Sequence, residues 1–193
     1  MSLVTQEFLG SFVDRIAGSE SLVGPAGIHA GDPFSGTFSY DSAASPVSST
    51  SIAATYPANS FTVTLPNGME LGASEVSIRV SKEDQDPSIE VFGKLPHNNT
   101  FMGILLRGPG GATGPVTSTD LPTNIMVSSF IHKDLTLCDV ITPLFDYPRT
   151  PLPPGGSTIF LRGHLTTLQR VSCLSLALGL LSAKYCAFRR QPT

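Results

Sequence analysis

The acidic turn at residues 82–87 comes closest, of all parts of the sequence, to a chemical site. It reads Lys-Glu-Asp-Gln-Asp-Pro, so Glu83, Asp84 and Asp86 place three carboxylates within four residues. Hard cations such as Ca²⁺ bind several carboxylate and carbonyl oxygens in a flexible loop, so these residues are the candidate metal ligands. The turn lacks the glycine and the final glutamate of an EF-hand loop, and a solvated charged turn is the simpler interpretation. We expect no cofactor, and Ca²⁺ is the one metal to test.

No catalytic pattern accompanies this turn. The sequence has no Gly-x-Ser-x-Gly elbow, no His-Glu-x-x-His zinc motif and no Gly-x-Gly-x-x-Gly. The glycine-rich stretch from Gly108 to Gly114 lacks the lysine of a phosphate-binding loop. The four histidines stand singly, without a second histidine or a paired carboxylate at ligand spacing: His29, His97, His132 and His164. We therefore predict that the protein is not an enzyme.

The composition limits the class of protein further. The 193 residues are 40% apolar and only 14% charged, which suits one buried domain with fewer surface charges than most cytosolic proteins carry. The formal net charge of −3 and the absence of tryptophan argue against nucleic acid as a partner. The three cysteines show neither Cys-x-x-Cys nor zinc spacing, and they predict no disulfide framework: Cys138, Cys173 and Cys186.

The stretch from Gly31 to Asp41 predicts the strand around which the core is built. Gly31-Asp32-Pro33 forms a turn before it, and Asp41-Ser42 ends it. Side chains two residues apart lie on the same face of a strand, so rings and hydroxyls would separate. The two predicted sets are Phe34, Phe38 and Tyr40 on one face, and Ser35, Thr37 and Ser39 on the other.

Further short apolar or alternating runs, separated by Gly/Pro turns, predict an all-β fold. The predicted strands are residues 4–16, 61–65, 69–71, 76–80, 89–95, 101–107, 125–131, 135–141 and 158–168. We expect an antiparallel, jelly-roll-like β-sandwich of about eight to ten strands. The polar tract from Ser42 to Ser51 reads as a long mobile connection. The predicted core is Phe34, Phe38, Tyr40, Val76, Ile78, Val80, Ile104, Leu106, Phe160 and Leu165.

The last residues differ in kind, so we divide the chain into a β-domain at 1–169 and a C-terminal segment at 170–193. As a helix, Val171 to Phe188 would be about 27 Å long, just short of a hydrocarbon core of about 30 Å. The basic pair after it would place the C-terminus in the cytoplasm. An apolar helix packed on the β-domain is the alternative. The predicted anchor residues are Leu174, Leu176, Leu178, Leu180, Leu181, Arg189 and Arg190.

Several of these stretches together resemble the exported bacterial proteins that carry a PEP-CTERM sorting signal. They are Gly31–Asp41, Phe61-Thr-Val-Thr, Asp120-Leu-Pro, and Gly163-His-Leu-Thr-Thr-Leu before an apolar tail that ends in Arg-Arg. The resemblance implies a signal peptide, a β-rich body and a tail read by an exosortase, in bacteria that make extracellular polysaccharide. Two features of the family are absent: Arg170-Val-Ser-Cys stands in place of Pro-Glu-Pro, and residues 4–16 lack the pattern of a signal peptide.

The sequence therefore predicts a non-catalytic exported protein of the cell surface or extracellular matrix, held by its C-terminal segment. Its expected partners are the membrane, an exosortase and extracellular polysaccharide. The alternative is a soluble β-sandwich module that binds carbohydrate and packs its tail on the body. Such modules stack sugars on exposed planar rings, and with tryptophan absent only Tyr56, Tyr147 and a few Phe residues in loops could take that role.

Overall fold

The structure, a computed structural model, describes residues 3–15, 27–83, 86–96, 100–110, 114–138 and 159–171. Most of these residues belong to β-strands, as the sequence predicted. Within the described ranges the only helix is the 3₁₀ turn η1 (Val127–Ser129), so the body is all-β. The predicted C-terminal helix lies in residues 172–193, outside the part of the chain that the structure describes.

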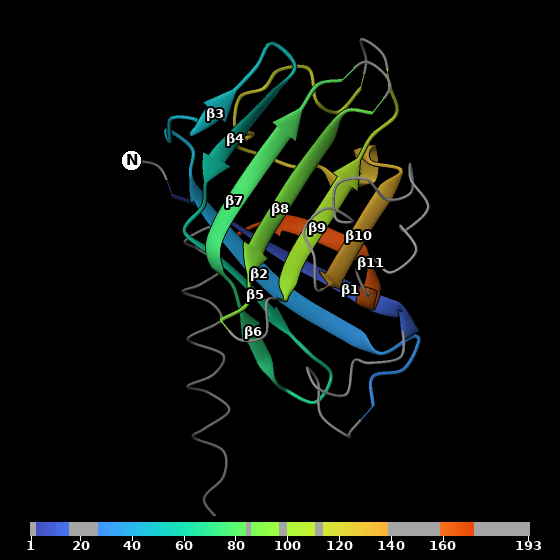
Figure 1. The fold of residues 1–193 in the computed structure, drawn as a ribbon. Helices are drawn as coiled ribbons and strands as arrows, with labels where there is room; N and C mark the ends of the chain where they lie inside the picture. Colours follow the sequence, from blue (N-terminus) through green and yellow to red (C-terminus); the bar gives the residue numbers. More distant parts are fainter. Residues whose placement is uncertain are drawn as a thin grey trace, which may run out of the picture.

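Eleven strands form one hydrogen-bonded sheet in which every pair is antiparallel (Figure 1). The order across the sheet is β3-β4-β7-β8-β9-β10-β11-β1-β2-β5-β6. The strands are β1 (Leu3–Arg15), β2 (Pro33–Asp41), β3 (Ser48–Ser49), β4 (Ala53–Pro57), β5 (Ser60–Thr64), β6 (Glu70–Gly72), β7 (Ser74–Ser81), β8 (Ser88–Lys94), β9 (Phe101–Arg107), β10 (His132–Cys138) and β11 (Ile159–Arg170).

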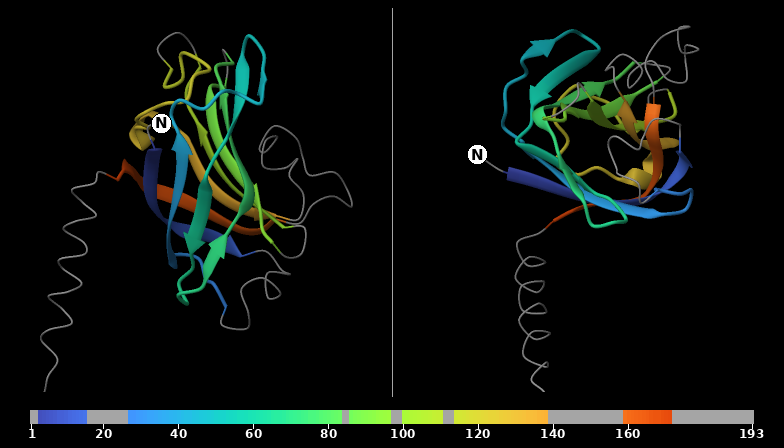
Figure 2. Two further views of the ribbon diagram at one scale, coloured as in Figure 1. Left: turned by 90° about the vertical axis from the view of Figure 1, so that its left-hand side faces the viewer. Right: turned by 60° about the horizontal axis from the view of Figure 1, so that its bottom comes forward.

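The sheet curls around a central space, so its two arms face each other (Figure 2). We call β1, β2, β5 and β6 the aromatic arm, and β3, β4, β7, β8, β9 and β10 the aliphatic arm. β11 lies between β10 and β1 and joins the two arms. This corrects the predicted sandwich, because the same faces meet across one core but belong to one continuous sheet of eleven strands.

The aromatic arm turns its rings inward, as the alternation in Gly31–Asp41 predicted. Phe34, Phe38 and Tyr40 are buried, and the ring of Phe38 stacks on Tyr40 with centroids 6.1 Å apart. Glycines make room for these rings. A Cβ atom at Gly36 would collide with the Phe8 ring and with the carbonyl oxygen of Thr62, so a strand interior that normally disfavours glycine requires one here.

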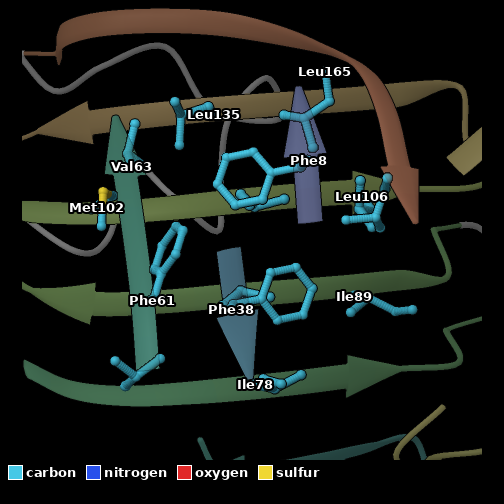
Figure 3. Packing of buried hydrophobic residues seen from close by; sticks show 14 of the residues in the cluster. Phe8, Phe38, Phe61, Val63, Ile78, Ile89, Met102, Leu106, Leu135 and Leu165 are labelled. Atoms are coloured by element: carbon cyan, nitrogen blue, oxygen red, sulfur yellow. The ribbon is translucent and has the colours of Figure 1, made fainter. Parts of the chain in front are cut away.

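The aliphatic arm supplies the opposite wall of the core. In Figure 3, Phe8, Phe38 and Phe61 lie over aliphatic side chains from β7 to β10, among them Ile78 and Leu106. The predicted core is confirmed wherever side chains are described; the side chain of Phe160 is not among them. The confirmed residues are Phe34, Phe38, Tyr40, Val76, Ile78, Val80, Ile104, Leu106 and Leu165.

Two segments differ from their predictions. The tract from Ser42 to Ser51, predicted as a mobile connection, contains β3, which pairs with β4 at the edge of the sheet. Residues 125–131, predicted as a strand, instead contain η1. There the backbone N–H of Ser129 donates to Met126 O at 3.0 Å, which is a local bond and not a sheet bond.

Residues 114–131, which we call the inner segment, run between β9 and β10. Four apolar side chains of this segment are buried in the core: Val116, Leu121, Ile125 and Phe130. The segment is the yellow trace that passes behind β7, β8 and β9 in Figure 1. It therefore fills part of the space between the two arms without joining the sheet.

Candidate functional site

The inner segment is fixed to both arms by side chains that donate hydrogen bonds to its carbonyl groups. From the aromatic arm, the hydroxyl of Tyr40 donates to Pro122 O. From the aliphatic arm, the hydroxyl of Tyr56 donates to Thr119 O at 2.9 Å. These bonds satisfy buried polar groups on a segment that has no strand partner, and they hold its backbone in one position.

A cleft of about 290 Å³ lies between the inner segment and the inner faces of β7 and β8. Val80 of β7 and Ile89 of β8 are almost wholly buried and provide the sheet side of the cleft. The other lining residues belong to the inner segment: Pro115, Val116, Thr117, Ser118, Asp120, Leu121, Pro122 and Thr123. The cleft therefore combines an apolar floor with a rim of hydroxyls and one carboxylate.

Asp120 is the charged residue of this rim. Its backbone N–H donates to the hydroxyl oxygen of Ser118 at 3.2 Å, which closes a tight local turn. Burial raises the pKa of the Tyr56 hydroxyl, and the negative charge of Asp120 raises it further. Asp120 is the charged side chain among the described residues that line the cleft, and the guanidinium of Arg170 donates to the carbonyl oxygen of the lining residue Thr123 at 3.5 Å.

A second polar cluster lies on the opposite, outward face of the aliphatic arm. Glu90 of β8 is buried there; Ser88 donates to its carboxylate at 3.0 Å, and the guanidinium of Arg79 lies 3.4 Å from it. Burial raises the pKa of the Glu90 carboxyl, and the attraction of Arg79 only partly opposes this. An enclosed space of about 10 Å³ beside Glu90 and Gly103 has room for about one water molecule.

The histidines do not all stand alone, contrary to the prediction. His164 Nδ1 lies 3.5 Å from the carboxylate of Asp134, which also pairs with Arg162 at 3.1 Å. His29 Nδ1 lies 3.6 Å from Asp32. Both contacts involve exposed histidines, and such surface pairs contribute little to stability.

The predicted metal ligands occupy the turn between β7 and β8. Glu83 and Asp86 are described, and the backbone N–H of Asp86 donates to Glu83 O at 3.1 Å. Asp84 lies outside the described residues. Among the residues that are described, no three His, Cys, Asp or Glu side chains are grouped so that they could hold a metal ion. The interpretation of this turn as a solvated charged turn, with Ca²⁺ as the one metal to test, stays a prediction.

The predicted anchor lies beyond the described part of the chain. It comprises Leu174, Leu176, Leu178, Leu180, Leu181, Arg189 and Arg190. Within the described ranges, no helix has the length and apolar character needed to cross a membrane.

Sequence reasoning missed the cleft and its rim. Asp120-Leu121-Pro122 was noted only as part of a family resemblance, and Thr117 and Ser118 were not noted at all. Of the two tyrosines considered for sugar stacking, Tyr56 is buried and its hydroxyl is already bonded to Thr119 O, and Tyr147 lies outside the described residues. The only signal in the sequence was the crowding of Thr, Ser, Asp and Pro between two apolar runs.

The comparisons with known proteins add no relative. No protein-family model matches the chain, and no match was found among curated proteins or among solved structures.

Proposed function

We propose that this chain is a non-catalytic, exported bacterial protein whose β-body is displayed at the cell surface or in the extracellular matrix by its C-terminal segment. The stretches that resemble PEP-CTERM proteins are the basis of this proposal. An exosortase and extracellular polysaccharide are the partners that it implies.

The position at which the β-body ends carries the proposal. β11 pairs with β10 on one side and with β1 on the other, and Arg170 lies opposite Gln6 in this register. The backbone N–H of Val171 donates the last of these bonds to Thr5 O at 2.9 Å. The apolar residues follow directly in the sequence, so the last described strand is paired on both sides up to the point where the predicted anchor begins.

Cell fractionation of two versions of the chain, each with an added export signal, tests the proposal. One version is full-length, and the other ends after Val171, which preserves the bonds of Arg170 and Val171 to the body. We expect the full-length protein in the membrane fraction and the truncated protein in soluble form, with the same β-rich circular dichroism.

A pair of substitutions separates anchoring from core packing. Replacing Leu178 and Leu180 by Asp should release the protein, because each charge near the bilayer centre costs about 2.5–3.5 kcal/mol. Replacing the same two residues by Ala is the matched control and should leave the protein in the membrane fraction. If the truncated body aggregates while the intact chain is soluble and monomeric, the tail is part of the core and the proposal fails.

A further inference from the structure

We infer that the cleft between the inner segment and strands β7 and β8 is a binding site for a neutral sugar, one or two rings in size. This goes beyond the proposed display function and does not depend on how the chain is held at the surface. The argument uses only the described residues that form the cleft.

The size and position of the cleft suit a small ligand. Pockets that hold small molecules measure roughly 300–1,000 Å³ and occur often at the mouths of curled or closed β-sheets. The cleft measures about 290 Å³, at the lower end of that range. By contrast, the enclosed space beside Glu90 holds only about one water molecule. Of these two spaces, the cleft is the one with room for a ligand of one or two rings.

The side of the cleft that the inner segment forms is held in place before any ligand binds. Tyr40 and Tyr56 hold the backbone at Pro122 and Thr119, on either side of Asp120. Leu121, between them, is buried in the core. A pre-organised wall loses little conformational freedom on binding, which favours affinity.

The chemistry of the lining matches a sugar ring in two respects. Pro115 and Pro122, which are partly exposed, offer an apolar surface against which the C–H face of a ring can pack, and the buried Val80, Ile89 and Leu121 lie beneath it. The hydroxyls of Thr117, Ser118 and Thr123 and the carboxylate of Asp120 surround this surface. A carboxylate can accept hydrogen bonds from two neighbouring sugar hydroxyls, and bonds to a charged acceptor are the stronger kind.

The same lining argues against other ligand classes. An anion would meet the carboxylate of Asp120, while the guanidinium of Arg170, which donates to the carbonyl oxygen of Thr123 at 3.5 Å, is exposed to water and does not line the cleft. A flat aromatic ligand would find no ring to stack on among the described lining residues. A small amine could pair with Asp120, but that side chain is exposed to water, where an ion pair contributes little to binding.

Titration of the full-length chain with sugars tests the inference. The chain is kept in a detergent without a sugar headgroup, and glucose, galactose, mannose, xylose and maltose are each added to about 50 mM, which nearly saturates a millimolar site. Backbone amide shifts of residues 116–121 and 123 report binding, because Pro115 and Pro122 have no amide hydrogen. We expect at least one sugar to give saturable shifts confined to these residues and to their neighbours on β7 and β8.

Substitutions on the rim identify the site. Asp120→Asn should weaken sugar binding about tenfold, because it removes a charged acceptor. Thr117→Val, which removes only a hydroxyl and keeps the shape, should weaken it by a smaller factor. Glu70→Gln is the matched control: it changes an exposed carboxylate on the edge strand β6 and should leave affinity unchanged.

Three results would overturn the inference. They are no saturable shift with any of the sugars, saturable binding that Asp120→Asn leaves unchanged, and binding of ethanolamine at this cleft without binding of any sugar. None of these results bears on membrane fractionation, so the two proposals fail separately.

Discussion

The two arms of the sheet build one core from different side chains. The aromatic arm lines the core with phenylalanine rings fitted over glycines and turns a ladder of Ser and Thr hydroxyls outward. The aliphatic arm lines it with Val, Ile, Leu and Met and turns charged residues outward, among them Arg79, Glu90 and Asp134. Both arms bury one face, but they depend on different features of the sequence.

Because of this difference, different substitutions should destabilise the two arms. Large rings that pack over glycines leave no room for an added methyl group, so the aromatic arm is sensitive to overpacking. The aliphatic arm can lose a methyl group at modest cost, but its outward charges are partly buried and must be paired. Substitutions on both arms can therefore test whether the arms differ in this way.

The largest effect should follow the loss of a ring from the aromatic arm. Phe38→Ala should lower the free energy of unfolding by about 3–5 kcal/mol, because the ring is wholly buried and contacts Phe8 and Tyr40. Ile78→Val, on the facing arm, should cost only about 0.5–1.5 kcal/mol. Urea unfolding measures both; a loss below about 1 kcal/mol for Phe38→Ala would remove that ring from the core.

A single methyl group should distinguish two glycines. Gly36→Ala should cost about 1–3 kcal/mol, because the new Cβ would collide with Phe8 and with the carbonyl of Thr62. Gly72→Ala is the control: a Cβ there has no atom within 4 Å, and we expect a change below about 0.5 kcal/mol. Thermal unfolding of the two variants measures both changes. Equal losses in the free energy of unfolding would show that the packing of the rings does not require a glycine at position 36.

A smaller, pH-dependent effect should come from Glu90 on the aliphatic arm. Its pKa is raised above the ordinary value of 4.5, so between its unfolded and folded pKa values the folded protein binds more protons than the unfolded chain. The stability that protonated Glu90 contributes is fully present below the pKa that this group has in the unfolded chain, and it is lost as the pH rises through the pKa in the folded protein. Glu90→Gln should therefore flatten the loss of stability on going from about pH 4 to about pH 8.

The control for this prediction is Glu70→Gln, at the exposed edge of the sheet. Melting temperatures of the three proteins across the pH range give the comparison. If Glu90→Gln and the parent protein lose stability in parallel, the burial of Glu90 does not set the pH dependence.

The smallest effect should come from the hydroxyl ladder. Thr37 and Thr62 lie opposite each other on the outer face, with their hydroxyl oxygens 3.1 Å apart. A double-mutant cycle with Thr37→Val and Thr62→Val should give a coupling of about 0.2–1 kcal/mol, as for other cross-strand pairs. A coupling above about 2 kcal/mol would mean that the outer face stabilises this arm as much as its rings do.

The arms also differ in how far the sequence reveals them. The alternation of Phe34, Phe38 and Tyr40 with hydroxyl residues predicted both faces of β2, because successive side chains of a strand point to opposite faces of the sheet. It could not predict that β11 bonds to both arms and makes one sheet, since the partners of a strand depend on contacts distant in the sequence.

Weak local patterns account for the other errors. β4 reads Ala-Ala-Thr-Tyr-Pro, which carries little strand signal, and its partner β7 is remote. In residues 125–131, Ile125 and Phe130 are buried but lie five residues apart, while Met126 and Ile131 are 62% and 61% exposed. The cleft was missed because its floor comes from β7 and β8 and its rim from the inner segment.

The position of β11 also sets the order in which the fold can be completed. Of the described strands, β1 is synthesised first and β11 last, yet they pair along much of their length; the hydroxyl of Thr166 donates to Leu9 O, 157 residues earlier. Closing so long a loop is slow, and pairings distant in the sequence delay folding. Until β11 is made, β1 and β10 each present an unpaired edge that a strand of another chain can join. A chain that is exported while unfolded would carry these two open edges until its last described strand emerged.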